Sequence, residues 1–152
     1  MDFFKKLSIF GLIVATATIL ASCSVRRQEA NDLVTNKGKW SVAKITNYRY
    51  TFAVGCWCPR EMTSPVTIEV RNGVRTSLTR AKGIISSPKY FASFDTIEKV
   101  FQFTEKSINS KAEKVIVKYD SKLGYPISIS VDESKRYVDD EIGYSITNFE
   151  SL

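Results

Sequence analysis

Hydrophobic and polar residues alternate along six short segments of the chain, which is the pattern of strands that bury one face. In the first segment, Tyr48, Tyr50, Phe52 and Val54 share one face. The segments are 48–54, 66–70, 74–78, 115–119, 127–131 and 142–146. The pattern therefore predicts six half-buried strands.

Two other segments have helical character. Residues 29–44 suit a helix, although Gly38 weakens its middle by up to about 1 kcal/mol relative to alanine. The candidate inward positions of this helix are Leu33, Val34, Trp40 and Ala43. Asp95 is predicted to start a second helix, because Glu98 follows three residues later as in a capping box. An apolar stripe at helical spacing extends to Ile108 and is typical of core packing.

The elements follow one another as helix-strand-strand-strand and then helix-strand-strand-strand. This order suggests a possible duplication of one unit. It predicts an α+β domain with an antiparallel sheet of about six strands and two helices packed on one face.

The second and third strands are joined through Asn72-Gly73, a typical hairpin turn. A two-residue loop would set Val70 against Arg75, an apolar residue opposite a charged one. A three-residue loop that includes Arg71 instead pairs Val70 with Val74 and Ile68 with Thr76. We therefore expect the three-residue loop, with Gly73 left-handed in a bulge.

The first 22 residues have the features of an export signal. Lys5 and Lys6 precede an uncharged apolar run over residues 7–21, which is too short to cross a bilayer as a helix. The run ends in Leu20-Ala21-Ser22-Cys23, an arrangement that resembles the bacterial lipoprotein signal. The alternative is an ordinary cleaved signal followed by a spare cysteine.

The lipoprotein interpretation divides the chain into three parts. Residues 1–22 are a signal peptide, residues 23–30 a lipidated tether that begins with acylated Cys23, and residues 31–152 a single domain. Cys23 would take a diacylglycerol on its thiol and further acyl chains such as palmitate, which anchor the protein to the membrane. Ser24 at the next position favours the outer membrane, facing the periplasm, if the cell is Gram-negative.

Composition removes several kinds of chemistry. The chain has no histidine, which excludes Ser-His-Asp and Cys-His catalysis and histidine-ligated metals. Its seven glycines form no phosphate-binding loop, and no cofactor is expected. The net charge of +6 is spread along the chain, and with export this disfavours nucleic acid as a partner.

Cys56-Trp57-Cys58 is the most distinctive local motif. With Cys23 acylated, Cys56 and Cys58 form an even pair in an oxidising compartment, so a disulfide is expected if the chain bends there. The pair could be a structural staple, a redox-active dithiol or a soft-metal site, although two thiolates alone make an incomplete metal shell. Trp57 could be an exposed anchor for a partner or a cover over the core.

A second cluster of candidate ligands is acidic. Asp132-Glu133 and Asp139-Asp140-Glu141 flank a loop and could bind Ca²⁺. Their spacing matches no EF-hand loop, because glycine is missing and the acids are contiguous. We interpret them as a solvated loop and assign no metal site.

Several motifs resemble one family when they are taken in order. They are Trp40, Tyr48-Arg49-Tyr50, Cys56-Trp57-Cys58-Pro59, Asn72-Gly73, Thr96-Ile97-Glu98, Tyr119-Asp120 and Gly124-Tyr125-Pro126. From about Leu33 to Phe149 the chain resembles the bacterial lipoproteins of the domain of unknown function 6174 family. That family has no established activity, so the resemblance implies no catalytic or ligand-binding residues.

Two hypotheses about function follow. The first is a non-enzymatic, lipid-anchored module that binds an envelope protein or a cell-wall component, with Trp57 as a possible contact. The alternative is a thiol-redox or metal-handling lipoprotein that acts through Cys56 and Cys58. An enzyme that uses carboxylates ranks below both, because no pair of acids falls on a recognisable cleft.

Overall fold

The structure is a computed structural model that describes residues 26–134 and 141–152. After a helix over residues 26–43, the elements follow in this order: β1 (Tyr48–Gly55), α2 (Arg60–Thr63), β2 (Val66–Arg71), β3 (Val74–Thr79), a 3-10 turn η1 (Pro88–Phe91), α3 (Ile97–Ile108), β4 (Lys114–Tyr119), β5 (Pro126–Asp132) and β6 (Ile142–Ser151). All six strands predicted from the alternation are therefore present.

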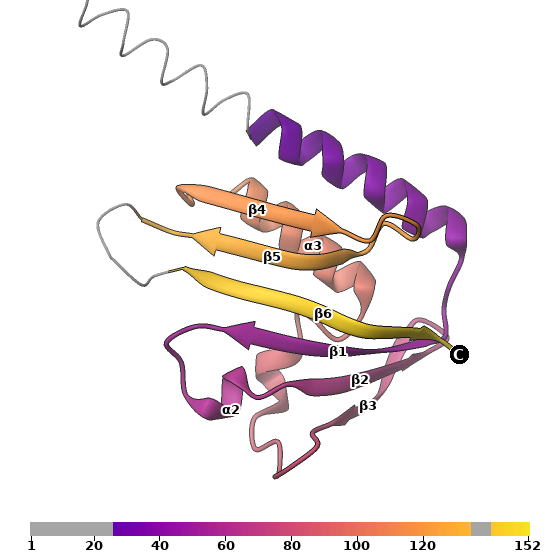
Figure 1. The fold of residues 1–152 in the computed structure, drawn as a ribbon. Coiled ribbons are helices and arrows are strands. Elements are labelled where there is room, and N and C mark those ends of the chain that lie inside the picture. The colour runs from indigo at the N-terminus through magenta and orange to yellow at the C-terminus, as the bar shows by residue number, and fades with distance from the viewer. Residues whose placement is uncertain (1–25, 135–140) are drawn as a thin grey trace, which may run out of the picture.

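The six strands form one antiparallel sheet in the order β3-β2-β1-β6-β5-β4. The helices pack on one side of it, and α3 lies behind the sheet in the view of Figure 1. The helix over residues 26–43 runs above β4, where Lys39 donates to the carbonyl oxygen of Ser121. The predicted α+β architecture is confirmed.

The possible duplication is visible in the element order but not in the sheet. Each half is a helix followed by a three-stranded meander. A two-fold axis normal to the sheet would set β1 beside its counterpart β4. Instead β1 pairs with β6, and β4 lies at the far edge. The two halves therefore share an order of elements without being related by such an axis.

The core is an aromatic cluster between the sheet and the helices. Tyr48, Tyr50 and Phe52 alternate along β1 toward the helix side, and each is at most 1% exposed. Phe94, in the segment before α3, stacks on Phe52 with ring centroids 4.5 Å apart. The Tyr50 hydroxyl donates to the carbonyl oxygen of Phe94, so this buried phenol has a partner. The face of β1 that the alternation predicted to be buried is therefore the face that packs in the core.

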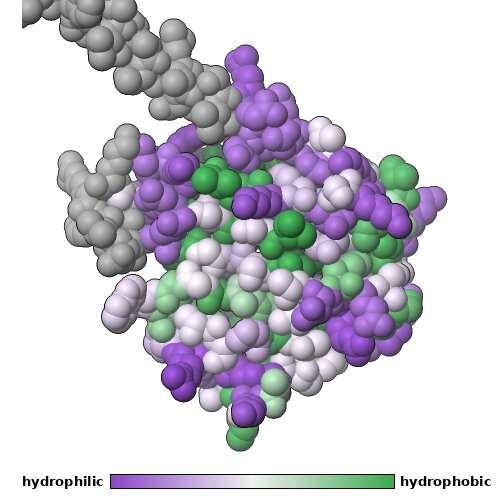
Figure 2. All heavy atoms as spheres, in the orientation of Figure 1, coloured by the Kyte–Doolittle hydropathy of each residue, from purple (hydrophilic) through white to green (hydrophobic). Residues whose placement is uncertain are grey.

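The opposite face of the sheet carries small polar residues. Thr67, Thr51 and Thr147 lie side by side across β2, β1 and β6, and Ser145 pairs with Ser128. Figure 2 looks onto this side, where residues of intermediate hydropathy form a pale band between charged margins. No described helix covers this face.

Both helix starts differ from their predictions. Residues 26–30, assigned to the tether, already belong to the first helix, in which Val34 points outward and is 71% exposed. The cap of α3 is Thr96 rather than Asp95, because the Thr96 hydroxyl accepts from the backbone N–H of Lys99. Glu98 is free of the predicted capping role and binds Trp40 and Tyr48 instead.

The predicted hairpin register is wrong. Arg71 pairs directly with Val74, so the loop has two residues, and both Asn72 (φ 51°) and Gly73 (φ 73°) are left-handed as a type I′ turn requires. The register shifts between Glu69 and Val70, and Ile68 then faces Leu78. We had expected the loop length to bring the apolar residues opposite each other. In the structure the bulge beyond the turn does this instead.

The physical reason for this register is an ion pair that is distant in sequence. Val70 faces Arg75, whose guanidinium lies 3.8 Å from the carboxylate of Asp95. Lys99 also contacts Asp95, at 2.7 Å. Arg75 therefore has an anionic partner on the core side, while Val74 is 65% exposed.

Candidate functional site

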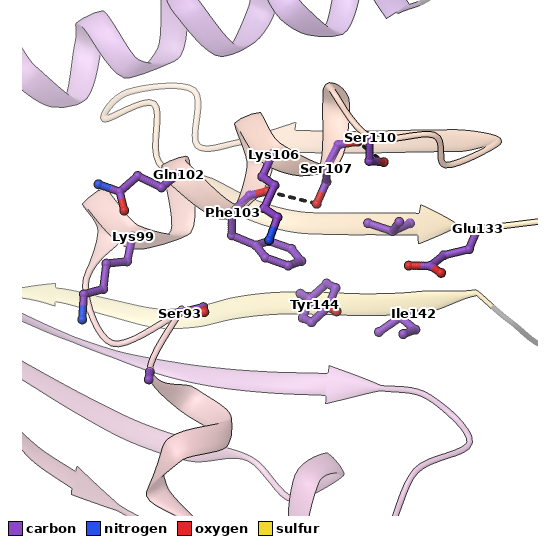
Figure 3. A pocket seen from close by; sticks show the side chains of 12 residues that line it. Ser93, Lys99, Gln102, Phe103, Lys106, Ser107, Ser110, Glu133, Ile142 and Tyr144 are labelled. Atoms are coloured by element: carbon purple, nitrogen blue, oxygen red, sulfur yellow. Dashed lines mark hydrogen bonds between the residues drawn. The ribbon is translucent and has the colours of Figure 1, made fainter.

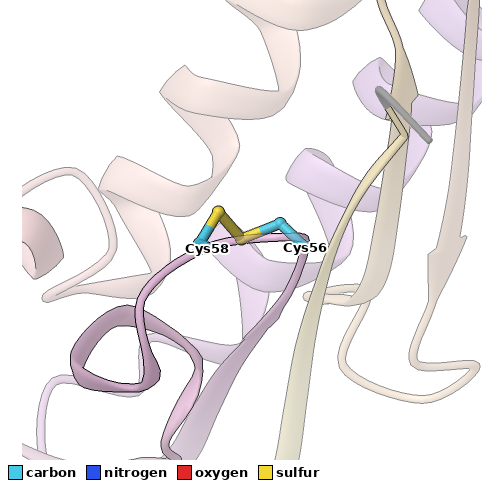
Figure 4. Close-up of a disulfide and its surroundings, with 2 residues drawn as sticks. All are labelled: Cys56 and Cys58. Carbon is cyan, nitrogen blue, oxygen red and sulfur yellow. A yellow bond between two sulfur atoms is a disulfide. The ribbon is translucent and has the colours of Figure 1, made fainter. Parts of the chain in front are cut away.

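The Cys56-Trp57-Cys58 loop follows the last residue of β1. Gly55 ends the strand opposite Gly143 of β6, and the chain then bends so that the Cα atoms of Cys56 and Cys58 are 5.2 Å apart. The two cysteines form a disulfide, as expected (Figure 4). The ring encloses one residue, Trp57.

Trp57 is the most exposed large hydrophobic residue in the described part of the chain. It is 92% exposed, so it does not cover the core. Of the two interpretations that the sequence left open, the geometry selects the exposed side chain. An exposed tryptophan on a fixed backbone is a candidate anchor for a binding partner.

The backbone around Trp57 is fixed on both sides. On one side β1 is hydrogen-bonded to β2 and β6. On the other, Pro59 accepts from the N–H of Met62 at 2.8 Å as α2 begins, and Arg80 donates to the carbonyl oxygen of Glu61 at 2.6 Å. The tryptophan is therefore presented on a braced turn and not on a free loop.

Arg80 also brings a second exposed apolar residue to this end of the sheet. Its guanidinium reaches the carbonyl oxygen of Ile84 at 3.5 Å, and the Ile84 side chain is 86% exposed. Arg80 therefore connects α2, next to the Trp57 loop, with the segment that follows β3. We call this end of the sheet, which carries Trp57 after β1 and Ile84 after β3, the Trp57 end.

A cavity that the sequence did not indicate lies between α3 and the ends of β5 and β6 (Figure 3). Its volume is about 610 Å³, and Phe103 and Tyr144 form part of its floor with ring centroids 4.8 Å apart. Burial, and then the charge of nearby Glu133, raise the pKa of the Tyr144 phenol. The one available signal was Phe103, an aromatic residue in α3 that lies off the predicted apolar stripe.

Comparison with known protein families assigns the chain to one of them. Residues 32–151 match the model of a family of unknown function, DUF6174. The chain belongs to this family. No curated protein and no solved structure matches it. Membership covers the whole sheet and α3, and it supplies no activity for any residue.

Apart from Glu133, which lines the cavity, the remaining candidate residues of this DUF6174 chain fall into two groups. Cys23, Asp139 and Asp140 lie outside the described residues. Glu141 accepts from the Ser130 hydroxyl at 2.5 Å, and Asp132 accepts from the backbone of Ser134. Across residues 26–134 and 141–152, no three metal-ligating side chains come together, and no helix is long and apolar enough to span a bilayer.

Proposed function

We propose that this chain is a lipid-anchored protein of the cell envelope that binds an envelope protein or a cell-wall component through the Trp57 end. The observation that carries the binding role is the 92% exposure of Trp57 on a disulfide-closed turn. Tryptophan is enriched at binding hot spots, and a braced turn loses little backbone freedom when a partner docks.

The anchor rests on the signal pattern, which ends in Leu20-Ala21-Ser22-Cys23. The described helix already includes Arg26, three residues beyond Cys23. Three residues of extended chain span at most about 10 Å. An acyl group on Cys23 would therefore keep the domain next to the membrane surface, where only nearby envelope partners can reach it.

Lipidation is tested by metabolic labelling. Radiolabelled palmitate should enter the wild-type protein and should not enter the Cys23→Ala variant. Label in both forms, or a mature N-terminus at another residue, would contradict the anchor without touching the binding role.

The binding role is tested by photo-crosslinking in intact cells. A photoreactive amino acid at position 57 should give one dominant crosslinked product of higher mass. The matched control is position 42, because Val42 is also exposed (80%) but belongs to the first helix. Equal crosslinking at both positions, or adducts with lipid alone, would contradict a specific partner at Trp57.

The second candidate function is thiol-disulfide exchange, or metal handling, at Cys56 and Cys58. It is favoured by the partial exposure of both side chains in a surface turn, where a thiol can reach the sulfur atoms. Reduction would also release two thiolates that suit soft metals. Thiol titration separates the candidates: a pair that cycles under mild reductant supports exchange, and a pair that stays oxidised supports the binding module.

A further inference from the structure

The cavity beneath α3 has the size and walls of a small-molecule site. Its volume of about 610 Å³ falls within the range of about 300–1,000 Å³ that is common for ligand pockets. Ile142 and Val131 extend the apolar floor that Phe103 and Tyr144 begin. The cavity shares no lining residue with the Trp57 end, although Tyr144 pairs with Val54 near the end of β1.

The charged residues that line the cavity differ in whether they form ion pairs. Lys99 forms an ion pair with Asp95 at 2.7 Å and shares this carboxylate with Arg75. Lys106 of α3 and Glu133 after β5 form no hydrogen bond or ion pair with any other described residue. In Figure 3 they come from opposite walls and reach toward the same space above β5 and β6. Among the described residues that line it, the cavity therefore offers one unpaired cation and one unpaired anion.

This arrangement favours one class of ligand. A simple anion would gain from Lys106 but would be repelled by Glu133, and a simple cation would meet the reverse. A molecule that carries both charges and an apolar part satisfies both groups and the aromatic floor at once. Gln102 and Ser93, which also line the cavity, supply neutral hydrogen-bonding groups at its edge.

We propose that the cavity binds a small zwitterion of the amino-acid or short-peptide class that carries an apolar side chain. The ligand's carboxylate lies against the ammonium of Lys106, and its amino group lies against the carboxylate of Glu133. Its apolar side chain packs on Phe103 and Tyr144. This activity goes beyond the proposed binding of a macromolecular partner, and its failure would leave that proposal intact.

The first test is calorimetric titration of the full chain with matched probes. The probes are leucyl-leucine, its N-acetyl derivative, its C-terminal amide and dodecanoate. We expect saturable binding of leucyl-leucine, and affinity at least about tenfold lower when either terminus is blocked, because each blocked form leaves one charge unpaired. No binding of leucyl-leucine at millimolar concentration, or equal binding of dodecanoate, would overturn the proposal.

Variants then assign each charge to its contact. Lys106→Gln should weaken leucyl-leucine and should lose the preference for a free carboxylate over the amide. Glu133→Gln should lose the preference for a free amino group over the N-acetyl form. The matched control is Lys118→Gln, on the exposed side of β4, which should keep the wild-type ranking of all four probes.

A charge exchange makes the test independent of any general loss of binding. Lys106→Glu and Glu133→Lys should each abolish binding, because each leaves two like charges facing the cavity. The double exchange restores one cation and one anion in reversed positions, so it should regain most of the lost affinity. A double variant that binds no better than the single variants would refute the paired recognition, provided that its thermal midpoint matches that of the wild type.

Discussion

The two tryptophans of the chain occupy opposite environments. Trp40 is 5% exposed, and its indole N–H donates to the carboxylate of Glu98 at 2.8 Å. Its ring makes edge-on contacts with Tyr48, Tyr125 and Phe149. Trp57 is 92% exposed on a disulfide-closed turn. The same residue type therefore stabilises the fold at one position and is presented to solvent at the other.

The two tryptophans call for different measurements, because only Trp40 is part of the core. Trp40 joins the first helix to α3 and β1, so its loss removes packing and leaves Glu98 without one of its donors. Trp57 follows β1, and its removal creates no cavity. Evidence of a role for Trp57 must therefore come from binding, whereas evidence of a role for Trp40 must come from unfolding.

The largest expected effect is at Trp40. Trp40→Ala should lower the free energy of unfolding by about 3–5 kcal/mol, because it empties a buried site lined by three rings. Urea denaturation followed by circular dichroism measures this loss. Trp57→Ala is the comparison and should stay within about 0.5 kcal/mol of the wild type. Similar losses of unfolding free energy at both positions would contradict the difference between a buried Trp40 and an exposed Trp57.

Two glycines test how closely the first helix docks. A Cβ added at Gly124 would lie 2.4 Å from the carbonyl oxygen of Asn36, and the φ of Gly124 is 81°. Gly124→Ala should therefore cost about 1–3 kcal/mol by pushing the helix that carries Trp40 away from the sheet. Gly38 lies in the same helix with nothing near its Cβ position, so Gly38→Ala should stabilise by up to about 1 kcal/mol. Thermal melts should show a lower midpoint for Gly124→Ala and a higher midpoint for Gly38→Ala.

The core beside Trp40 should also respond to alkaline pH. Burial raises the pKa values of Tyr48 and Tyr50 above the ordinary value in the folded state. Above about pH 10 the unfolded chain loses these protons first, so the free energy of unfolding should fall as the pH rises, whereas below that pH the two phenols contribute no slope. Urea midpoints between about pH 9 and 11 measure the fall. Tyr50→Phe should make it shallower, and an unchanged slope would contradict this cause.

A small effect on stability is expected from the disulfide of the Trp57 turn. Replacing both Cys56 and Cys58 by serine opens a ring that encloses one residue, for which loop entropy predicts a loss of about 1.5 kcal/mol or less. The sheet should remain intact, because β1 keeps its pairing with β2 and β6. Hydrogen exchange of β1 amides checks this. General loss of protection would mean that the disulfide holds the fold and not only the turn.

The features that depend on local periodicity, namely the strands and their buried faces, could be predicted from the sequence. Tyr48, Tyr50 and Phe52 alternate, and their burial on one face follows from the two-residue repeat of a strand. The hairpin register was missed because it depends on Arg75 reaching Asp95, which is twenty positions away in the chain. The same reach across the fold explains why Glu98 binds Trp40 instead of capping its own helix.

The candidate site was predictable only in part. The spacing of Cys56 and Cys58 predicted the disulfide, but the motif was compatible with either orientation of Trp57, and only the fold decides between them. The cavity lies where α3 meets β5 and β6, so Lys106 and Glu133 meet only after folding. No short motif contains both residues.

The central claim, that Trp57 binds an envelope partner, is tested most directly without the lipid anchor. Residues 23–152 carrying Cys23→Ala would be purified and titrated onto washed cell envelopes, so that retention depends on the domain alone. We expect saturable retention of the wild-type domain. Trp57→Ala should weaken this retention by about tenfold or more with an unchanged thermal midpoint, and Val42→Ala should leave it intact. Equal retention of the Trp57→Ala and Val42→Ala proteins would contradict it.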